Sequence, residues 1–364
     1  MKSKMLPWQF ALVISGYIVG SSLVLSFMDN LLRQDTWISI ILGTLAAVPM
    51  VWCYVLLCRR FPGSSLLDIN NIVFGPVIGR GVSAVYILYA MLLLTFNLRD
   101  LGDFYVGNIL PVTPMAVFMV FTLLVSAYAV RKGAVPLFRV AIFALLYQIV
   151  TFLATTAMLL GRMDFGNLLP VLEAKPHALL QSAHIFAAIP IGDAFLFMLF
   201  FPAVTDQRKL GRTMFGGVGL GALVLLLMSL RNAAVLGPST GVLLGNNYQA
   251  VRIIDIAEFL TRLEMLVALG VTFMLFVRIA MMHFSVVKGV THILNLRCGG
   301  ALILPIAGIA VVLAVIAFPS TAAHGYSGAR YHPFYPLLPE MILPPVTLLV
   351  AALRRLDGRA EAKQ

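Results

Sequence analysis

Two apolar segments of the chain contain residues that weaken a helix near its middle. These residues are Ser15, Gly16, Gly20 and Ser21 in the first segment, and Ile189, Pro190, Gly192 and Asp193 in the second. An interrupted helix leaves peptide N–H and C=O groups without partners, and lipid tolerates this only where a cavity or a solute satisfies them. The start of a half-helix also carries a partial positive charge that suits a carboxylate. The paired interruptions therefore predict a binding site for a small solute at mid-depth in a membrane.

Two charged residues lie well inside apolar segments, where hydrocarbon makes a charge costly by at least about 2.5 to 3.5 kcal/mol. Asp193 is predicted either to bind a proton or an amine, or to form a structural pair with a basic side chain. Arg278 is predicted either to stand as a fixed cation where a coupling cation would bind, or to extend to the cytoplasmic interface. Because arginine keeps its proton, it would act as a counter-ion and not as a proton carrier.

Close packing of helices is the alternative explanation for the glycines. Gly16 and Gly20 form a G-x-x-x-G pattern, and Gly217 and Gly221 form another, for which packing is the expected role. In the second segment, a proline without a backbone donor and a flexible glycine directly beside Asp193 favour the binding interpretation.

Two pairs of opposite charges, each four residues apart, lie at segment ends. They are Arg99 with Asp103 and Glu258 with Arg262. Residues four apart are neighbours on a helix surface. Both pairs are predicted to be mainly structural ion pairs at the membrane edge, or parts of an outer gate.

The elements that must position these residues are apolar segments of membrane-spanning length. The 364 residues are 60% hydrophobic and 11% charged, with a mean hydropathy of +0.96, whereas a soluble domain carries roughly 25% charge. Segments of about 20 apolar residues can cross a bilayer. Ten are predicted, at 8–27, 37–58, 77–98, 115–130, 138–160, 179–204, 213–236, 259–286, 300–318 and 335–353. We therefore expect an all-α polytopic membrane protein, with a single transmembrane domain over residues 1–364 that ends in a cytoplasmic tail at 354–364.

The distribution of charge predicts the orientation. Seventeen Lys and Arg residues lie in one set of alternate loops and six in the other. Because cytoplasmic loops carry the excess of Lys and Arg, both termini are predicted to be cytoplasmic. This also explains the net charge of +11 without a nucleic-acid partner.

Catalysis is not expected from the sequence. The chain contains no H-E-x-x-H, P-loop or G-x-S-x-G motif, and its six histidines and three cysteines show no metal-ligand spacing. Neither a cofactor nor a metal is therefore predicted.

Short motifs along the whole chain resemble those of one known family. Two are fairly specific, Arg59-Arg60-Phe61-Pro62-Gly63 and Asn167-Leu168-Leu169-Pro170-Val171-Leu172. The other matching motifs are Gln9-Phe10 with Ser15, Gly20 and Ser21; Arg99-Asp100-Leu101-Gly102-Asp103-Phe104; Leu110-Pro111 with Thr113-Pro114; Ala127-Tyr128-Ala129-Val130-Arg131; Phe200-Phe201-Pro202; Val235-Leu236-Gly237-Pro238; and Arg262-Leu263-Glu264. With these motifs the chain resembles the endospore germination permeases, the B subunits of spore germinant receptors.

The resemblance implies a fold, a setting and partners. The family belongs to the amino acid, polyamine and organocation superfamily, which implies the LeuT-like fold of five spans plus five inverted spans, with broken first and sixth helices. The repeats would then cover about 8–160 and 179–353. A ligand would bind between spans one, three, six, eight and ten, in the spore inner membrane, alongside A-type and C-type receptor subunits. The acid at Asp193 is often glutamate in relatives, and Arg278 stands where a lysine is expected.

Three functions are compatible with these features. The first is ligand recognition in a germinant receptor, where an amino acid or similar small molecule is sensed. The second is a proton-coupled amino acid permease, and the third is a membrane scaffold that binds nothing. The paired interruptions and Asp193 favour the first two, and the lack of an internal lysine in the fifth span favours sensing slightly over transport. The sequence names neither the ligand, nor a coupling ion, nor the oligomeric state.

Overall fold

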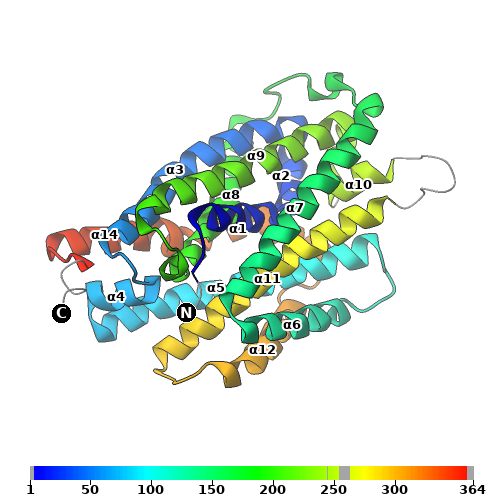
Figure 1. The fold of residues 1–364 in the computed structure, drawn as a ribbon. Helices are drawn as coiled ribbons and strands as arrows, with labels where there is room; N and C mark the ends of the chain where they lie inside the picture. Colours follow the sequence, from blue (N-terminus) through cyan, green and yellow to red (C-terminus); the bar gives the residue numbers. More distant parts are fainter. Residues whose placement is uncertain (1–3, 244, 254–262, 359–364) are drawn as a thin grey trace.

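The computed structural model describes residues 4–243, 245–253 and 263–358, which are helical nearly throughout (Figure 1). Within these residues extended pairing is limited to one bridge, between Met5 and Val204. The α-helices are α1 (Pro7–Val19), α2 (Val24–Leu32), α3 (Thr36–Arg60), α4 (Leu66–Phe74), α5 (Pro76–Asn108), α6 (Met115–Lys132), α7 (Ala134–Leu159), α8 (Pro176–Phe186), α9 (Leu210–Leu236), α10 (Asn246–Arg252), α11 (Glu264–Ile293), α12 (Ile303–Ile316), α13 (Thr321–Arg330) and α14 (Leu343–Leu353). The all-α class predicted from the sequence is confirmed for the described part.

The number of spans depends on how the interrupted helices are counted. Eight helical segments among the described residues are long and apolar enough to cross a membrane, and a ninth is obtained when α12 and α13 are taken as one bent span. The sequence predicts ten. The difference lies at 8–27, because α1 has only 13 residues, too few to cross a bilayer alone, and residues 20–23 separate it from α2.

Helix α1 lies in the middle of the bundle, where it packs against α7 and α9 (Figure 1). The glycines of α9 allow the close approach. A Cβ atom at Gly217 would lie 2.7 Å from the Ala11 carbonyl oxygen, and one at Gly221 would lie 2.8 Å from Cβ of Ile18. The prediction that this G-x-x-x-G pattern forms a packing face is therefore confirmed.

The backbone changes its helical pitch in both segments where interruptions are expected. After α1, the N–H of Ser21 bonds to the Ile18 carbonyl, three residues back, at 2.9 Å. In the other segment, α8 continues into a π-helix at Ala187–Ile191 and then a 3₁₀ helix at Gly192–Leu199. Pro190 has no N–H to donate, and a wide π turn accommodates it. Both segments are thus tightened or widened helices and not extended backbone.

The end of α5 fixes a bend of 97° between α12 and α13. Arg99 Nη1 donates to the Phe318 carbonyl at 3.0 Å, just after the last turn of α12. Asp103 accepts a hydrogen bond from the Thr321 hydroxyl at 2.6 Å, and Nδ1 of His324 lies 2.8 Å from its second oxygen. An ion pair of 3.1 Å joins Arg99 to Asp103. The two charges together therefore anchor the end of one helix and the start of the next.

Candidate functional site

The guanidinium group of Arg278 in α11 joins the two irregular segments. Its Nη2 forms an ion pair with Asp193 Oδ2 at 2.5 Å. Its Nη1 donates to the Tyr17 carbonyl at 3.0 Å and to the Ser21 hydroxyl. Its Nε donates to Asn97 Oδ1 in α5 at 2.8 Å. We call these five residues the central cluster.

The turn after α1 explains why the Tyr17 carbonyl is free for an arginine. In a regular α-helix this carbonyl would accept from the N–H of Ser21, but that N–H bonds to Ile18 instead. Gly20 permits the approach, since a Cβ atom there would lie 2.7 Å from Cδ of Arg278. Arg278 thus satisfies a carbonyl within the segment whose unpaired peptide groups were predicted to face a cavity or a solute.

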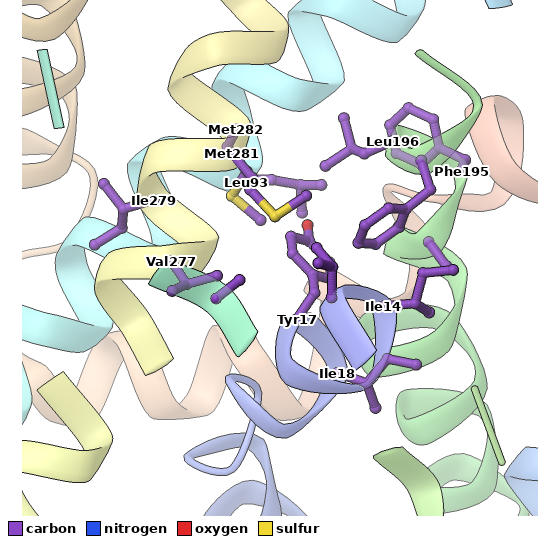
Figure 2. Packing of buried hydrophobic residues seen from close by; sticks show 14 of the residues in the cluster. Ile14, Tyr17, Ile18, Leu93, Phe195, Leu196, Val277, Ile279, Met281 and Met282 are labelled. Carbon is purple, nitrogen blue, oxygen red and sulfur yellow. The ribbon is translucent and has the colours of Figure 1, made fainter. Parts of the chain in front are cut away.

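The central cluster is closed off from solvent by aromatic and apolar side chains. Arg278 is 1% exposed and Asp193 is 0% exposed. The guanidinium carbon lies 4.3 Å from the centroid of the Tyr17 ring. Figure 2 shows Tyr17 surrounded by apolar side chains of other segments, including Leu93 and Phe195. In such surroundings the attraction between the two charges is much stronger than in water.

A second buried carboxylate, Glu340, lies beside the central cluster. It belongs to the π-helix Leu337–Ile342 that precedes α14. Its side chain is fully buried and lies within electrostatic reach of Asp193 and Tyr89, but neither oxygen has a partner at normal hydrogen-bonding geometry. The Tyr89 hydroxyl donates to Asp193 Oδ1 at 3.4 Å. Among the described residues, Arg278 forms its ion pair with Asp193 and not with Glu340, so Glu340 is a second acid buried beside this pair without a cation of its own.

Tyr54 in α3 joins the 3₁₀ helix Gly192–Leu199 to the π-helix Leu337–Ile342 through their backbones. Its hydroxyl lies 3.3 Å from the Gly192 carbonyl and 3.2 Å from the Glu340 carbonyl. A Cβ atom at Gly192 would overlap Oε2 of Glu340. The glycine is therefore required for the contact between these segments.

The other predicted binding residues lie near the central cluster without hydrogen-bonding to the guanidinium. Ser15 is buried, and its hydroxyl has no hydrogen-bond partner among the residues that the structure describes. Gly16 faces α7, where a Cβ atom would lie 3.3 Å from the Ala141 carbonyl oxygen, as expected of a packing position. Ile189 and Pro190 are buried within the π-helix. Of the predicted residues, Gly20, Ser21, Gly192, Asp193 and Arg278 thus come together.

Of the two ion pairs predicted at segment ends, one lies within the described residues and the other does not. Arg99 and Asp103 lie apart from the central cluster and hold the bend between α12 and α13. Glu258 and Arg262 lie outside the described residues, so their pairing stays a prediction. Across 4–243, 245–253 and 263–358, no group of three or more His, Cys, Asp or Glu residues is placed to hold a metal ion.

Sequence reasoning missed Tyr17, which contributes its carbonyl group and its ring. It also missed the side chains of four further residues of this region, namely Tyr54, Tyr89, Asn97 and Glu340. Glu340 had a visible signal, because it is an acid next to a proline inside the last apolar segment. Asn97 is polar within the third segment, close to Arg99. The two tyrosines carry no such signal, since tyrosine is common in apolar segments and only the fold brings their hydroxyls to the site.

The arrangement of helices resembles that of secondary transporters of known structure. A Na⁺-coupled sialic acid symporter in a substrate-bound, outward-open state superposes with a TM-score of 0.64, at 10% identity, over 93% of this chain and 79% of the symporter. Mhp1, a nucleobase-cation-symport-1 family transporter in a closed conformation, gives 0.60 at 11% identity, over 96% and 78% of the two chains. At this level of identity the likeness concerns the fold alone. The chain therefore has the fold of these transporters, and its long apolar helices are those of a membrane protein.

Sequence comparison identifies the family. The family model described as "Spore germination protein" matches residues 4–323, and the chain belongs to this family. Spore germination protein KB of Bacillus subtilis (strain 168) is 24% identical over 98% of this chain and 96% of its own length. The putative spore germination protein YfkT of the same organism is 29% identical over 72% of both chains. The resemblance found in the sequence motifs is thereby confirmed.

Proposed function

We propose that the chain is the membrane-embedded ligand-recognition subunit of a spore germinant receptor, sensing an amino acid or similarly small germinant at the central cluster. One observation supports this above all. A single buried guanidinium, that of Arg278, satisfies the turn after α1 and at the same time pairs with Asp193 in the other irregular segment. The interactions that hold these two segments are charged and polar, so a charged solute can compete for them.

A ligand with an ammonium group would exchange partners with Arg278. The ammonium group would take over Asp193 and the Tyr17 carbonyl, and the released guanidinium would pair with the ligand carboxylate. Helices α1, α5 and α11 and residues 192–199 meet at the central cluster, so their relative positions would change with this exchange. The ligand would shift the balance between two forms by its differential affinity for them.

The proposal also includes the number of spans, their arrangement in two repeats and the orientation of the chain in the membrane. Ten spans arise when α1 with α2 is counted as one broken span, and they would form two inverted repeats at about 8–160 and 179–353. Both termini would lie in the cytoplasm, as the excess of Lys and Arg in alternate loops favours. The protein would work in the spore inner membrane, beside A-type and C-type receptor subunits that read out its state.

Direct binding to the purified chain in lipid nanodiscs tests the proposal. The 20 common amino acids would be screened by calorimetry, and each hit repeated with Asp193→Asn. Loss of the charged partner should weaken binding by at least about tenfold. Asp206→Asn is the matched control, because Asp206 is a partly exposed acid that pairs with Lys209 and takes no part in the central cluster. Unchanged affinity in Asp193→Asn would contradict the proposed site.

A second candidate function, a proton-coupled amino acid permease, is favoured by Glu340. Because Glu340 is buried beside the Asp193–Arg278 pair with no cation of its own among the described residues, the local charge is balanced when one of the two carboxyl groups holds a proton. A permease could use this proton by releasing it when the substrate ammonium group arrives.

Uptake into proteoliposomes separates the two functions. Accumulation driven by a pH gradient supports a permease, and in that case Glu340→Gln should abolish accumulation while substrate binding persists. Binding without any flux supports the receptor subunit.

A further inference from the structure

Three arginines are buried in the described part of the chain, and two of them, Arg99 and Arg278, form ion pairs there, whereas Arg231 does not. Arg231 of α9 is 4% exposed. Its hydrogen-bond partners are neutral oxygens, at 3.2 Å on Thr155, at 2.8 Å on the side chain of Asn232, and on the side chain of Asn247 in α10. In the described part of the chain no carboxylate forms an ion pair with it. An unpaired buried charge is strongly unfavourable, so its retention calls for a partner of opposite charge.

The two amides beside Arg231 accept from the guanidinium through their oxygens and keep their NH₂ groups available as hydrogen-bond donors. A guanidinium only donates, so Asn232 and Asn247 must turn their oxygens toward it. Their Nδ2 groups are thereby left free, and neither donates a hydrogen bond to any described group. Both residues line a small cavity, together with Ser22 and Phe104. Arg231 itself does not line this cavity, but its guanidinium is hydrogen-bonded to both of the amides that do. A cavity with two amide donors on its wall and a cation directly behind them is suited to an anion.

The acid nearest to this region in the hydrogen-bond network does not neutralise the guanidinium. Asp29 of α2 accepts from Asn246 Nδ2 at 2.5 Å, and the same amide donates to the Thr240 carbonyl at 3.1 Å. Asp29 is thus engaged by a neutral amide and forms no ion pair with Arg231. The positive charge stays available to a solute.

We propose that Arg231, Asn232 and Asn247 form a binding site for the carboxylate of a small solute, separate from the central cluster. The cavity measures about 10 Å³, room for about one water molecule, so a carboxylate binds as α10 moves away from α9. Ser22 lines this cavity, whereas Ser21, the residue before it, bonds to Arg278. Occupation of the Arg231 site therefore acts on the same turn that closes the central cluster. This last link rests on the proposed function, but the carboxylate site itself does not.

Thermal unfolding of the purified chain in detergent tests the site with acetate as the probe. Sodium acetate should raise the unfolding temperature in a concentration-dependent way, while acetamide and sodium chloride at matched ionic strength should not. Arg231→Met should abolish the acetate effect. Arg252→Gln, which changes an exposed arginine at the end of α10, should keep it. An acetate effect that persists in Arg231→Met overturns the proposal.

A second variant keeps the test decisive if Arg231→Met fails to fold. Asn247→Asp places a carboxylate within reach of the guanidinium, in the role assigned to the solute. It should raise the unfolding temperature without acetate and remove the response to acetate. A lower unfolding temperature, or an unchanged response to acetate, contradicts the proposal.

The central-cluster variant Arg278→Met distinguishes failure of this site from failure of the proposed function. If acetate still acts on Arg278→Met and not on Arg231→Met, the two sites are separate, as proposed. If acetate acts on Arg231→Met and not on Arg278→Met, the carboxylate binds at the central cluster, which overturns the Arg231 site and leaves the proposed function standing. Absence of any acetate effect on the unaltered chain overturns the Arg231 site alone.

Discussion

The backbone of Gly192 lies directly against the carboxylate of Glu340, and one tyrosine hydroxyl bridges the carbonyl oxygens of both residues. The two residues come from irregular helices that are far apart in the sequence. Because a π turn or a change to 3₁₀ pitch alters the hydrogen-bonding of nearby carbonyls, Tyr54 can reach both of these groups. Contact between the two segments therefore depends on the absence of a side chain at position 192.

A side chain at position 192 should abolish ligand binding while the protein still folds. In Gly192→Ala the new Cβ atom would displace the Glu340 carboxylate and disturb the adjacent Asp193. We expect loss of amino acid binding and of the germination response, while the protein still inserts in the membrane. Gly216→Ala is the matched control, since a Cβ atom at Gly216 meets no atom within 4 Å. A normal response in Gly192→Ala would count against the site.

The ion pair between Arg278 and Asp193 should show strong coupling in a double-mutant cycle. Arg278→Met leaves a buried carboxylate without its cation, which costs about 3 to 5 kcal/mol for a buried pair. Adding Asp193→Asn removes that charge, so the double variant should recover part of the lost stability. Thermal unfolding of the four proteins in detergent measures the effect. Simple additivity of the two single changes would show that the pair contributes no direct interaction.

Replacement of Arg278 by lysine tests the geometry of the site separately from its charge. The guanidinium donates to four acceptors. They are the Tyr17 carbonyl in α1, the Ser21 hydroxyl in the turn before α2, Asn97 in α5 and Asp193 in the segment 192–199. An ammonium group has three donors at a single point and cannot reach the same set. Arg278→Lys should therefore unfold at a temperature between those of the unaltered chain and Arg278→Met. A lysine variant as stable as the unaltered chain would show that charge alone matters at this position.

Hydropathy and helix breakers predicted much of the fold, because lipid forces apolar segments to be helical and to satisfy their own backbone. They could not predict the form of the interruptions. Residues 20–23 keep local hydrogen bonds at a tighter pitch, and residues 187–191 widen into a π turn around Pro190. Such adjustments are fixed by neighbouring helices and not by local sequence. The role of these segments in ligand binding stays a prediction.

The sequence indicated only some of the residues of the central cluster. Asp193 and Arg278 stood out as charges in apolar segments, but their pairing depends on packing between residues 85 positions apart. Of the two positions considered for Arg278, the structure places the guanidinium inside the bundle and not at the membrane interface. The partners Asn97 and Tyr54 act through single polar groups, and only the three-dimensional arrangement identifies them.

The packing of α1 on α9 should be sensitive to the size of one residue. A Cβ atom at Gly217 would lie 2.7 Å from both the Ala11 carbonyl oxygen and Cβ of Ile14. Overpacking of this kind typically costs about 1 to 3 kcal/mol, so Gly217→Ala should lower the unfolding temperature. Gly219→Ala on the same helix is the control, because nothing lies within 4 Å of its Cβ position. Equal stability of the two variants would show that α1 is not held closely against α9.

The bend between α12 and α13 should loosen when Asp103 loses its charge. Asp103 accepts from Thr321, contacts His324 and balances the charge of Arg99. In Asp103→Asn one oxygen becomes an amide donor, so the start of α13 loses an acceptor and the buried guanidinium loses its counter-charge. Amide hydrogen exchange should then become faster in 321–330 and stay unchanged in α9. Arg330→Gln, an exposed change at the far end of α13, should leave the exchange at the start of α13 as it is. Protection that is equal in Asp103→Asn and the unaltered chain would mean that α13 is held by its apolar contacts alone.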